Sequence, residues 1–95
     1  ARNMVRILRK KGAQVIIAVT HIGTNMDCTI AARVPGIDII FGGHSHNYMS
    51  RPETVKTTLI VNGGEKGPAL VRLDVCLDKK GCLLPDSATY SLIPV

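Results

Sequence analysis

Apolar residues along this chain fall into short runs that predict a mixed α/β fold. Two largely apolar runs, at 14–19 and 37–41, are rich in β-branched residues and bounded by glycines, which is typical of strands buried on both faces. A third run, at 58–61, precedes the glycine-rich segment NGGEKG. Between the first two runs, residues 28–34 predict a short helix that ends before Pro35, because proline disfavours helical geometry in the preceding residue.

The two ends of the chain carry different patterns. Residues 2–11 place apolar side chains at helical spacing and precede Gly12, which predicts a helix with a glycine stop. Residues 69–77 alternate between apolar and polar positions, as in a strand with one exposed face. The segment DKKG predicts a turn after this strand. We expect a last strand at 89–95 and a long polar loop at 44–57.

All three histidines follow predicted strands. His21 comes after the first strand, and His44 and His46 come after the second. The connection between these strands is long enough for a crossover, so they should be parallel and end at the same edge of the sheet. Open α/β sheets bind ligands at that edge, and imidazole is a common ligand of Zn, Fe, Cu and Ni. The spacing therefore predicts a metal site there.

Two other polar residues near the histidines have simpler explanations. Ser45 lies between His44 and His46, but no G-x-S-x-G turn surrounds it as in a serine hydrolase. We therefore expect a loop hydroxyl that bonds to the backbone. Asp27 precedes the predicted short helix, and we expect its carboxylate to cap the amino end of that helix.

Composition narrows the choice of function. Ninety-five residues make a single small domain, and no stretch approaches the roughly 18 apolar residues of a membrane span. The net charge is +5, and five of the twelve basic residues lie in the first eleven positions. No aromatic residues interleave with them to stack bases, which favours a solvated helix face over a nucleic-acid surface. Cys76 and Cys82 flank the DKKG turn. Their spacing is compatible either with a disulfide between them or with two free thiols.

The segment VIIAVTHIGTNMDCTIAARVPGIDIIFGGHSH resembles the calcineurin-like metallophosphoesterases, and within them the 5′-nucleotidase family. The shared pattern is a strand ending in Ser/Thr-His-x-Gly, a following aspartate, a short helix, VPGID, and a strand ending in Gly-Gly-His-Ser/Thr-His. The segments VNGGEKGPALVRLDVCLD and YSLIPV are similar to later parts of the same catalytic domain. The resemblance runs over nearly the whole chain.

The resemblance implies a hydrolase of nucleotides or of other phosphate monoesters or diesters. Members of the family use two divalent metal ions, of the Zn, Mn or Fe type, which activate a water molecule. The resemblance assigns His21 and His44 to one ion and His46 to the other. It also places four loop residues beside the site, namely Gly43, Asn62, Gly63 and Gly64.

The motifs of the family's first half, Asp-x-His, Gly-Asp-x-x-Asp and Gly-Asn-His-Asp/Glu, do not occur here. The resemblance therefore implies that residues 1–95 form the second half of a catalytic domain. The expected fold is α/β, a βαβ unit with further strands taken from a four-layer α/β/β/α sandwich. We expect weak metal retention and no turnover by this chain alone. Because half a sandwich exposes a sheet edge, we expect self-association or cover by the domain's first half.

Two other functions remain open at this stage. One is a non-catalytic module that kept the fold and still binds a metal or another ligand. The other, which the composition favours less, is a basic nucleic-acid-binding module. Members of the resembled family are often exported, so the resemblance points to the periplasm or the cell surface.

Overall fold

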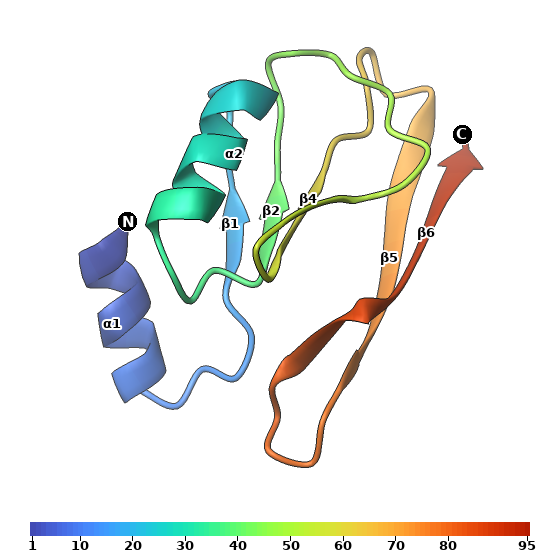
Figure 1. Cartoon of the computed structure of the whole chain (residues 1–95). Coiled ribbons are helices and arrows are strands. Elements are labelled where there is room, and N and C mark those ends of the chain that lie inside the picture. Colours follow the sequence, from blue (N-terminus) through green and yellow to red (C-terminus); the bar gives the residue numbers. More distant parts are fainter.

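A computed structural model describes the whole chain, residues 1–95, and its elements form three layers (Figure 1). Helices α1 (Arg2–Lys10) and α2 (Thr24–Arg33) lie on one side of a four-stranded sheet. The strand order is β1-β2-β4-β3. The strands of this sheet are β1 (Ile17–Val19), β2 (Ile39–Phe41), β3 (Glu53–Val55) and β4 (Thr58–Val61).

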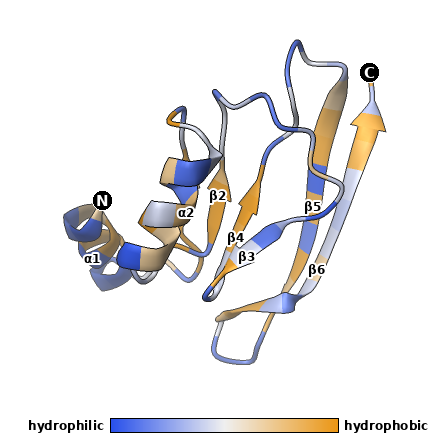
Figure 2. Cartoon of the chain, turned by 45° about the horizontal axis from the view of Figure 1, so that its top comes forward, coloured by the Kyte–Doolittle hydropathy of each residue, from blue (hydrophilic) through white to orange (hydrophobic).

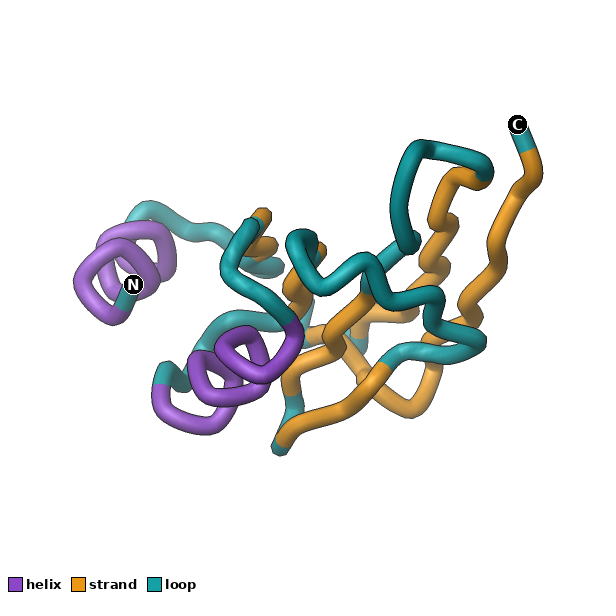
Figure 3. Tube along the Cα trace, turned by 90° about the horizontal axis from the view of Figure 1, so that it is seen from above, coloured by secondary structure: helices purple, strands orange, loops and turns teal.

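A two-stranded hairpin covers the other side of the sheet. It consists of β5 (Ala69–Leu77) and β6 (Leu83–Pro94), which pair antiparallel. Seen from above, the helices and the hairpin lie on opposite sides of the central strands (Figure 3). The predicted α/β class, with its βαβ unit and further strands, is therefore confirmed.

Strands β1, β2 and β4 are parallel, which confirms the prediction made for β1 and β2 from the length of their crossover. Ile40 in β2 lies opposite Ala18 in β1 and opposite Ile60 in β4. The carboxyl ends of all three strands consequently meet at one edge, which lies at the top of Figure 1.

The sheet divides the hydrophobic core in two, because neighbouring residues of a strand face opposite sides. On the helix side, Ile40 and Ile60 pack against Val34. On the hairpin side, Leu59 packs against Leu83. Figure 2 shows the hydrophobic colour along β2 and β4, which are covered from both sides, and alternating hydrophobic and hydrophilic colours along β5.

Strand β3 lies inside the segment that we expected to be a loop at 44–57. It is antiparallel to β4, with Thr54 opposite Leu59. Its sequence, Glu-Thr-Val, contains no apolar run, and the expectation of a loop was wrong for these residues. The strand forms because the free edge of β4 offers unpaired backbone groups.

The position of Asp27 also differs from our expectation. Helix α2 begins at Thr24 rather than at residue 28, and its N-cap is Gly23. Gly23 has φ +90°, which lets the chain turn into the helix four residues earlier than predicted. Asp27 therefore lies in the first turn, fully buried, and the prediction that it caps the helix was wrong.

The last strand is longer than predicted, and the cysteines are free. β6 begins at Leu83 rather than at residue 89, because Leu83 already pairs with Leu77 next to the turn. In this register Cys76 lies opposite Leu84 and not opposite Cys82. All three cysteines are free thiols, so the disulfide between Cys76 and Cys82 does not form.

Strand β1 is an edge strand whose hairpin-facing side is poorly covered. Ile17 is 53% exposed and Val19 is 83% exposed, so the prediction that this strand is buried on both faces was wrong. β1 also lies at one end of the strand order, so the expected exposed edge is present there. Neither helix is long and apolar enough to cross a membrane.

The amino ends of the parallel strands are held by Asp38. Its Oδ2 atom accepts a hydrogen bond from the backbone N–H of Ile16 at 2.8 Å and lies 2.7 Å from the Arg9 guanidinium. Arg9 also donates to the carbonyl of Gly36 at 2.9 Å. One side chain of α1 therefore ties the helix to the start of β1 and β2.

We expect Asp38→Asn to lower the free energy of unfolding by about 1–3 kcal/mol, because hydrogen bonds to a charged group are stronger than neutral ones. Urea denaturation of the full-length protein measures this change. Asp74→Asn is the matched control, since its ion pair with Arg72 is exposed and should contribute little. Equal effects of the two variants would show that Asp38 does not hold the strand ends.

Candidate functional site

Three loops meet at the carboxyl edge of the sheet. They follow β1, β2 and β4, and the strand pairing continues into them. The backbone N–H of Thr20 donates to the carbonyl of Phe41 at 2.9 Å, and that of Gly42 donates to the carbonyl of Val61 at 2.9 Å. The loops therefore begin at the same height on the sheet, and the structure brings the predicted site residues to one edge.

His21 and His44 lie against each other at this edge. Their ring centroids are 5.2 Å apart, and the rings meet edge to face at 74°. A methyl group on Gly43 would lie 3.1 Å from Nδ1 of His21, so the His21 ring lies directly over the glycine turn. Gly43 thus permits the close approach of the His21 ring to the loop after β2, because it has no side chain.

His46 lies apart from this pair. Its Nδ1 atom is 3.1 Å from Oε2 of Glu65, which belongs to the loop after β4. No group of three or more His, Cys, Asp or Glu side chains in residues 1–95 is close enough to hold a metal ion. The structure therefore brings His21 and His44 together and leaves His46 separate. The assignment of all three as metal ligands stays a prediction.

Asn62 follows β4 and is buried at the edge. Its Oδ1 atom accepts a hydrogen bond from the backbone N–H of Gly64 at 3.0 Å, and its Nδ2 atom is buried without a partner. The carbonyl of Asn62 accepts a hydrogen bond from the Tyr90 hydroxyl at 3.4 Å. Burial raises the pKa of Tyr90, so this hydroxyl remains a donor at neutral pH.

Tyr48 joins the loop after β2 to the loop after β4. It forms an isolated antiparallel bridge with Gly63, and its hydroxyl donates to the carbonyl of Glu65 at 3.1 Å. The Tyr48 ring packs so closely on Gly64 that a methyl group there would overlap the ring. The predicted loop residues Gly63 and Gly64 are therefore part of the contact that holds the two loops together.

Ser45 is held by the start of α2. Its hydroxyl oxygen accepts a hydrogen bond from the backbone N–H of Thr24 at 2.9 Å. In addition, Asn47 Nδ2 donates to Thr24 Oγ1 at 3.1 Å. The expected bond between the Ser45 hydroxyl and the backbone is confirmed, and it anchors the loop that carries His44 and His46.

Asp27 lies beneath the edge and was missed by the sequence analysis as a residue of the site. Its Oδ1 atom accepts a hydrogen bond from the Thr20 hydroxyl at 2.6 Å, whereas Oδ2 is buried without a partner. A helix starting at Thr24 places Asp27 on the same face as Ala31 and Val34, which are buried. That helical spacing was the available signal, and the predicted helix start at residue 28 concealed it.

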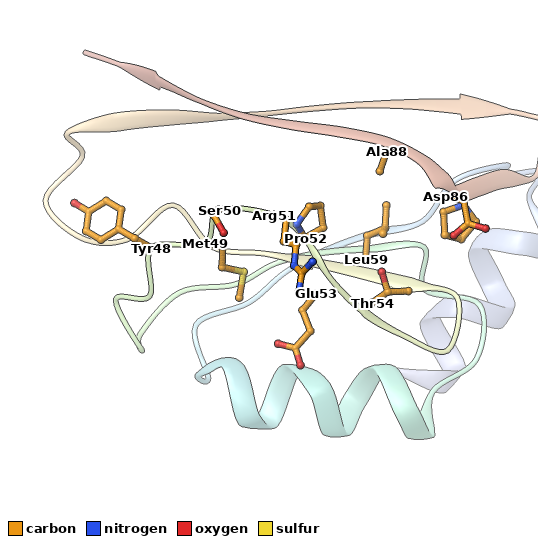
Figure 4. Close-up of a pocket in the computed structure, with 11 residues that line it drawn as sticks. Tyr48, Met49, Ser50, Arg51, Pro52, Glu53, Thr54, Leu59, Asp86 and Ala88 are labelled. Atoms are coloured by element: carbon orange, nitrogen blue, oxygen red, sulfur yellow. The ribbon is translucent and has the colours of Figure 1, made fainter.

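A cavity of about 950 Å³ lies away from the histidines. It opens between the segment 48–54 and strand β6 (Figure 4). Leu59 of β4 and Ala88 of β6 face each other across it, and Glu53 points toward α2. None of the three histidines lines this cavity. We assign the candidate site to the carboxyl edge, because the groups with metal-ligating chemistry meet there.

No model of a protein family matches the chain, but individual proteins are similar to it. The chain is 37% identical over 99 residues to the trifunctional nucleotide phosphoesterase YfkN of Bacillus subtilis, a match covering 100% of this chain and 7% of YfkN. The sulfate thiohydrolase SoxB of Thermus thermophilus has a TM-score of 0.88 at 34% identity, covering 98% of this chain and 17% of SoxB.

A 5′-nucleotidase precursor, also from Thermus thermophilus, has a TM-score of 0.80 at 27% identity, covering 99% of this chain and 22% of that protein. Together with the edge geometry, these matches show that the chain belongs to the 5′-nucleotidase family of the calcineurin-like metallophosphoesterases. This family is metal-dependent. The chain spans less than a quarter of the length of each of these proteins.

We expect Gly64→Ala to destabilise the protein more than Gly67→Ala. Both glycines have positive φ, +83° and +64°, so either alanine costs about 1–2 kcal/mol of backbone strain. At Gly64 the methyl group also meets the Tyr48 ring, whereas nothing lies within 4 Å of a methyl group at Gly67. Chemical denaturation of both variants gives the difference. Equal destabilisation would show that the contact with Tyr48 contributes nothing.

Proposed function

We propose that this chain is part of a two-metal phosphohydrolase that hydrolyses phosphate esters of nucleotides. The observation that carries the proposal is the edge-to-face pair of His21 and His44 at the carboxyl ends of β1 and β2. Two of the similar proteins are named for action on nucleotides, YfkN and the Thermus thermophilus 5′-nucleotidase. This supports nucleotides as the substrate class.

The residues at the edge fit part of a divalent-metal site. His21 and His44 supply adjacent nitrogen donors of a kind that suits Zn and Fe, and they would hold one ion. His46 would serve the other ion, with its ring oriented by Glu65 at 3.1 Å. Divalent ions held there would supply Lewis-acid chemistry, since they would polarise a phosphate ester and lower the pKa of a bound water.

The glycine turns and the carboxylate behind them shape this edge of the sheet. Gly43 lies against the His21 ring and Gly63 lies against Val71, and a side chain at either position would displace these neighbours. The buried carboxylate of Asp27 adds negative charge behind them, which favours a cation at the edge. These groups bind and orient, and none of them is placed to act as a nucleophile.

We further propose that residues 1–95 form the second half of the catalytic domain. Three histidines supply too few ligands for two ions. The remaining ligands would come from the first half of the domain. On this proposal the 95-residue chain alone retains metal weakly and does not turn over substrate.

In the full-length protein, we expect His44→Ala and His46→Ala each to lower phosphate release from AMP by orders of magnitude. Each variant removes a ligand from an exposed loop, so the fold should remain intact by circular dichroism. Ser45→Ala is the matched control on the same loop, because its hydroxyl bonds only to the backbone of Thr24 and Asn47 still ties the loop to Thr24 without it. Its rate should remain within a few-fold of the wild type.

Normal rates in both histidine variants would contradict the ligand assignment. A non-catalytic binding module is the alternative, and it would bind divalent metal without releasing phosphate from AMP or other phosphate esters. Nucleic-acid binding is disfavoured because Arg2 and Arg9 of the basic helix already bond to carbonyls within the chain, those of Arg33 and Gly36. An affinity for nucleic acid that falls steeply as the salt concentration rises would support nucleic-acid binding instead.

We also propose that another part of the full-length protein covers strand β1. When the 95-residue chain is expressed alone, its exposed edge should cause self-association, visible as a species larger than 10.2 kDa in light scattering. Val19→Lys should shift the chain toward the monomer. Leu70→Lys, at an exposed apolar site on the hairpin, should not. A monodisperse wild-type monomer would contradict the proposal.

A further inference from the structure

We propose that Asp27 is a positioning residue that holds His21 and His44 in the arrangement that binds a divalent cation. The inference rests on the proposed function, because it concerns the same edge of the sheet. Asp27 itself would not touch the cation or the substrate. It would act through the two loops that carry the imidazoles.

Asp27 contacts the start of the loop that follows β1. Its Oδ1 atom accepts the hydrogen bond from the Thr20 hydroxyl at 2.6 Å, a short distance typical of a charge-assisted bond to a carboxylate. Thr20 directly precedes His21 in the chain. Asp27 therefore fixes the end of β1 at the residue next to the first imidazole.

Asp27 also contacts the start of the loop that follows β2. The Oδ2 atom of Asp27 lies so close to Gly42 that a methyl group on this glycine would overlap it. Gly42 is two residues before His44, at the end of β2. The carboxylate is thus wedged between the ends of two neighbouring parallel strands, and its position sets the spacing of the loops above it.

Burial of the Asp27 carboxylate costs free energy. Asp27 is 0% exposed, no Lys or Arg forms an ion pair with it, and Oδ2 has no hydrogen-bond partner. A buried charge without a partner is expensive. An apolar or amide side chain would fill the same space at lower cost, so a structural role alone gives no reason for a carboxylate. A cation held by the imidazoles above it would compensate the charge.

The test is a titration of the metal-free full-length protein with Co²⁺, followed by visible absorption. Asp27→Asn keeps the size of the side chain and removes its charge. His44→Ala should lose one of the Co²⁺-binding steps of the titration. Asp27→Asn should weaken the Co²⁺ affinity of that same step by about tenfold or more, as is usual when a group that orients a metal ligand is altered. The absorption band of that step should also change shape. The step that is lost in His46→Ala should be unaffected.

Two substitutions of Thr20 keep the inference testable if Asp27→Asn fails to fold. Thr20→Val removes the hydroxyl that bonds Asp27 and should weaken the same Co²⁺ step. Thr20→Ser keeps the hydroxyl and should retain wild-type binding. Asp38→Asn is the matched control, because Asp38 holds the opposite, amino ends of the same strands. It should lower thermal stability without changing Co²⁺ affinity.

The outcomes separate this inference from the proposed function. If Asp27→Asn and Thr20→Val lose only stability and bind Co²⁺ like the wild type, Asp27 is purely structural and the positioning role is overturned. The proposed function would then stand on the histidine variants. If the wild-type full-length protein binds no Co²⁺ at either step, the proposed function and the positioning role fail together.

Discussion

The parallel pairing of β1, β2 and β4 is the constraint on which the rest of the structure depends. The three short strands share one register, so their carboxyl ends stop at one level. Hydrogen bonds from Thr20 and Gly42 extend that register by one residue into the loops. Helix α2 provides the crossover that parallel pairing requires. Groups far apart in the sequence, such as His21 and Asn62, meet at one edge as a consequence.

The two ends of this sheet differ in how fully their polar groups are paired. At the amino ends, Asp38 is paired with Arg9 and with the backbone of Ile16. At the carboxyl ends, Asp27 Oδ2 and Asn62 Nδ2 are buried without partners. Native proteins pair nearly all buried polar groups, and exceptions call for an explanation. The unpaired groups are concentrated at the edge where the histidines lie, which is where a functional site would leave bonding capacity unused.

The elements that sequence patterns predicted are those with a strong local signal. The continuous apolar runs predicted β2 and β4 because both faces of these strands are covered, and the alternating run predicted β5. Strand β3 has no such signal, since it pairs only with the free edge of β4. The disulfide considered across the DKKG turn does not form, because the register of β5 and β6 places Cys76 opposite Leu84 and not opposite Cys82. Register of this kind depends on the turn and on packing against the sheet.

The sequence by itself determined where the parallel strands lie, the parallel direction of the first two, and the placement of His21, His44 and His46 after their carboxyl ends. These follow from run length and crossover length, which are local properties. Only the tertiary structure decided that His21 pairs with His44 while His46 faces Glu65. It alone showed that Asp27 is buried between Thr20 and Gly42. Both outcomes depend on how loops pack after the strands align. The helical spacing of Asp27 with Ala31 and Val34 indicates an inward-facing residue, but it does not encode which residues Asp27 contacts.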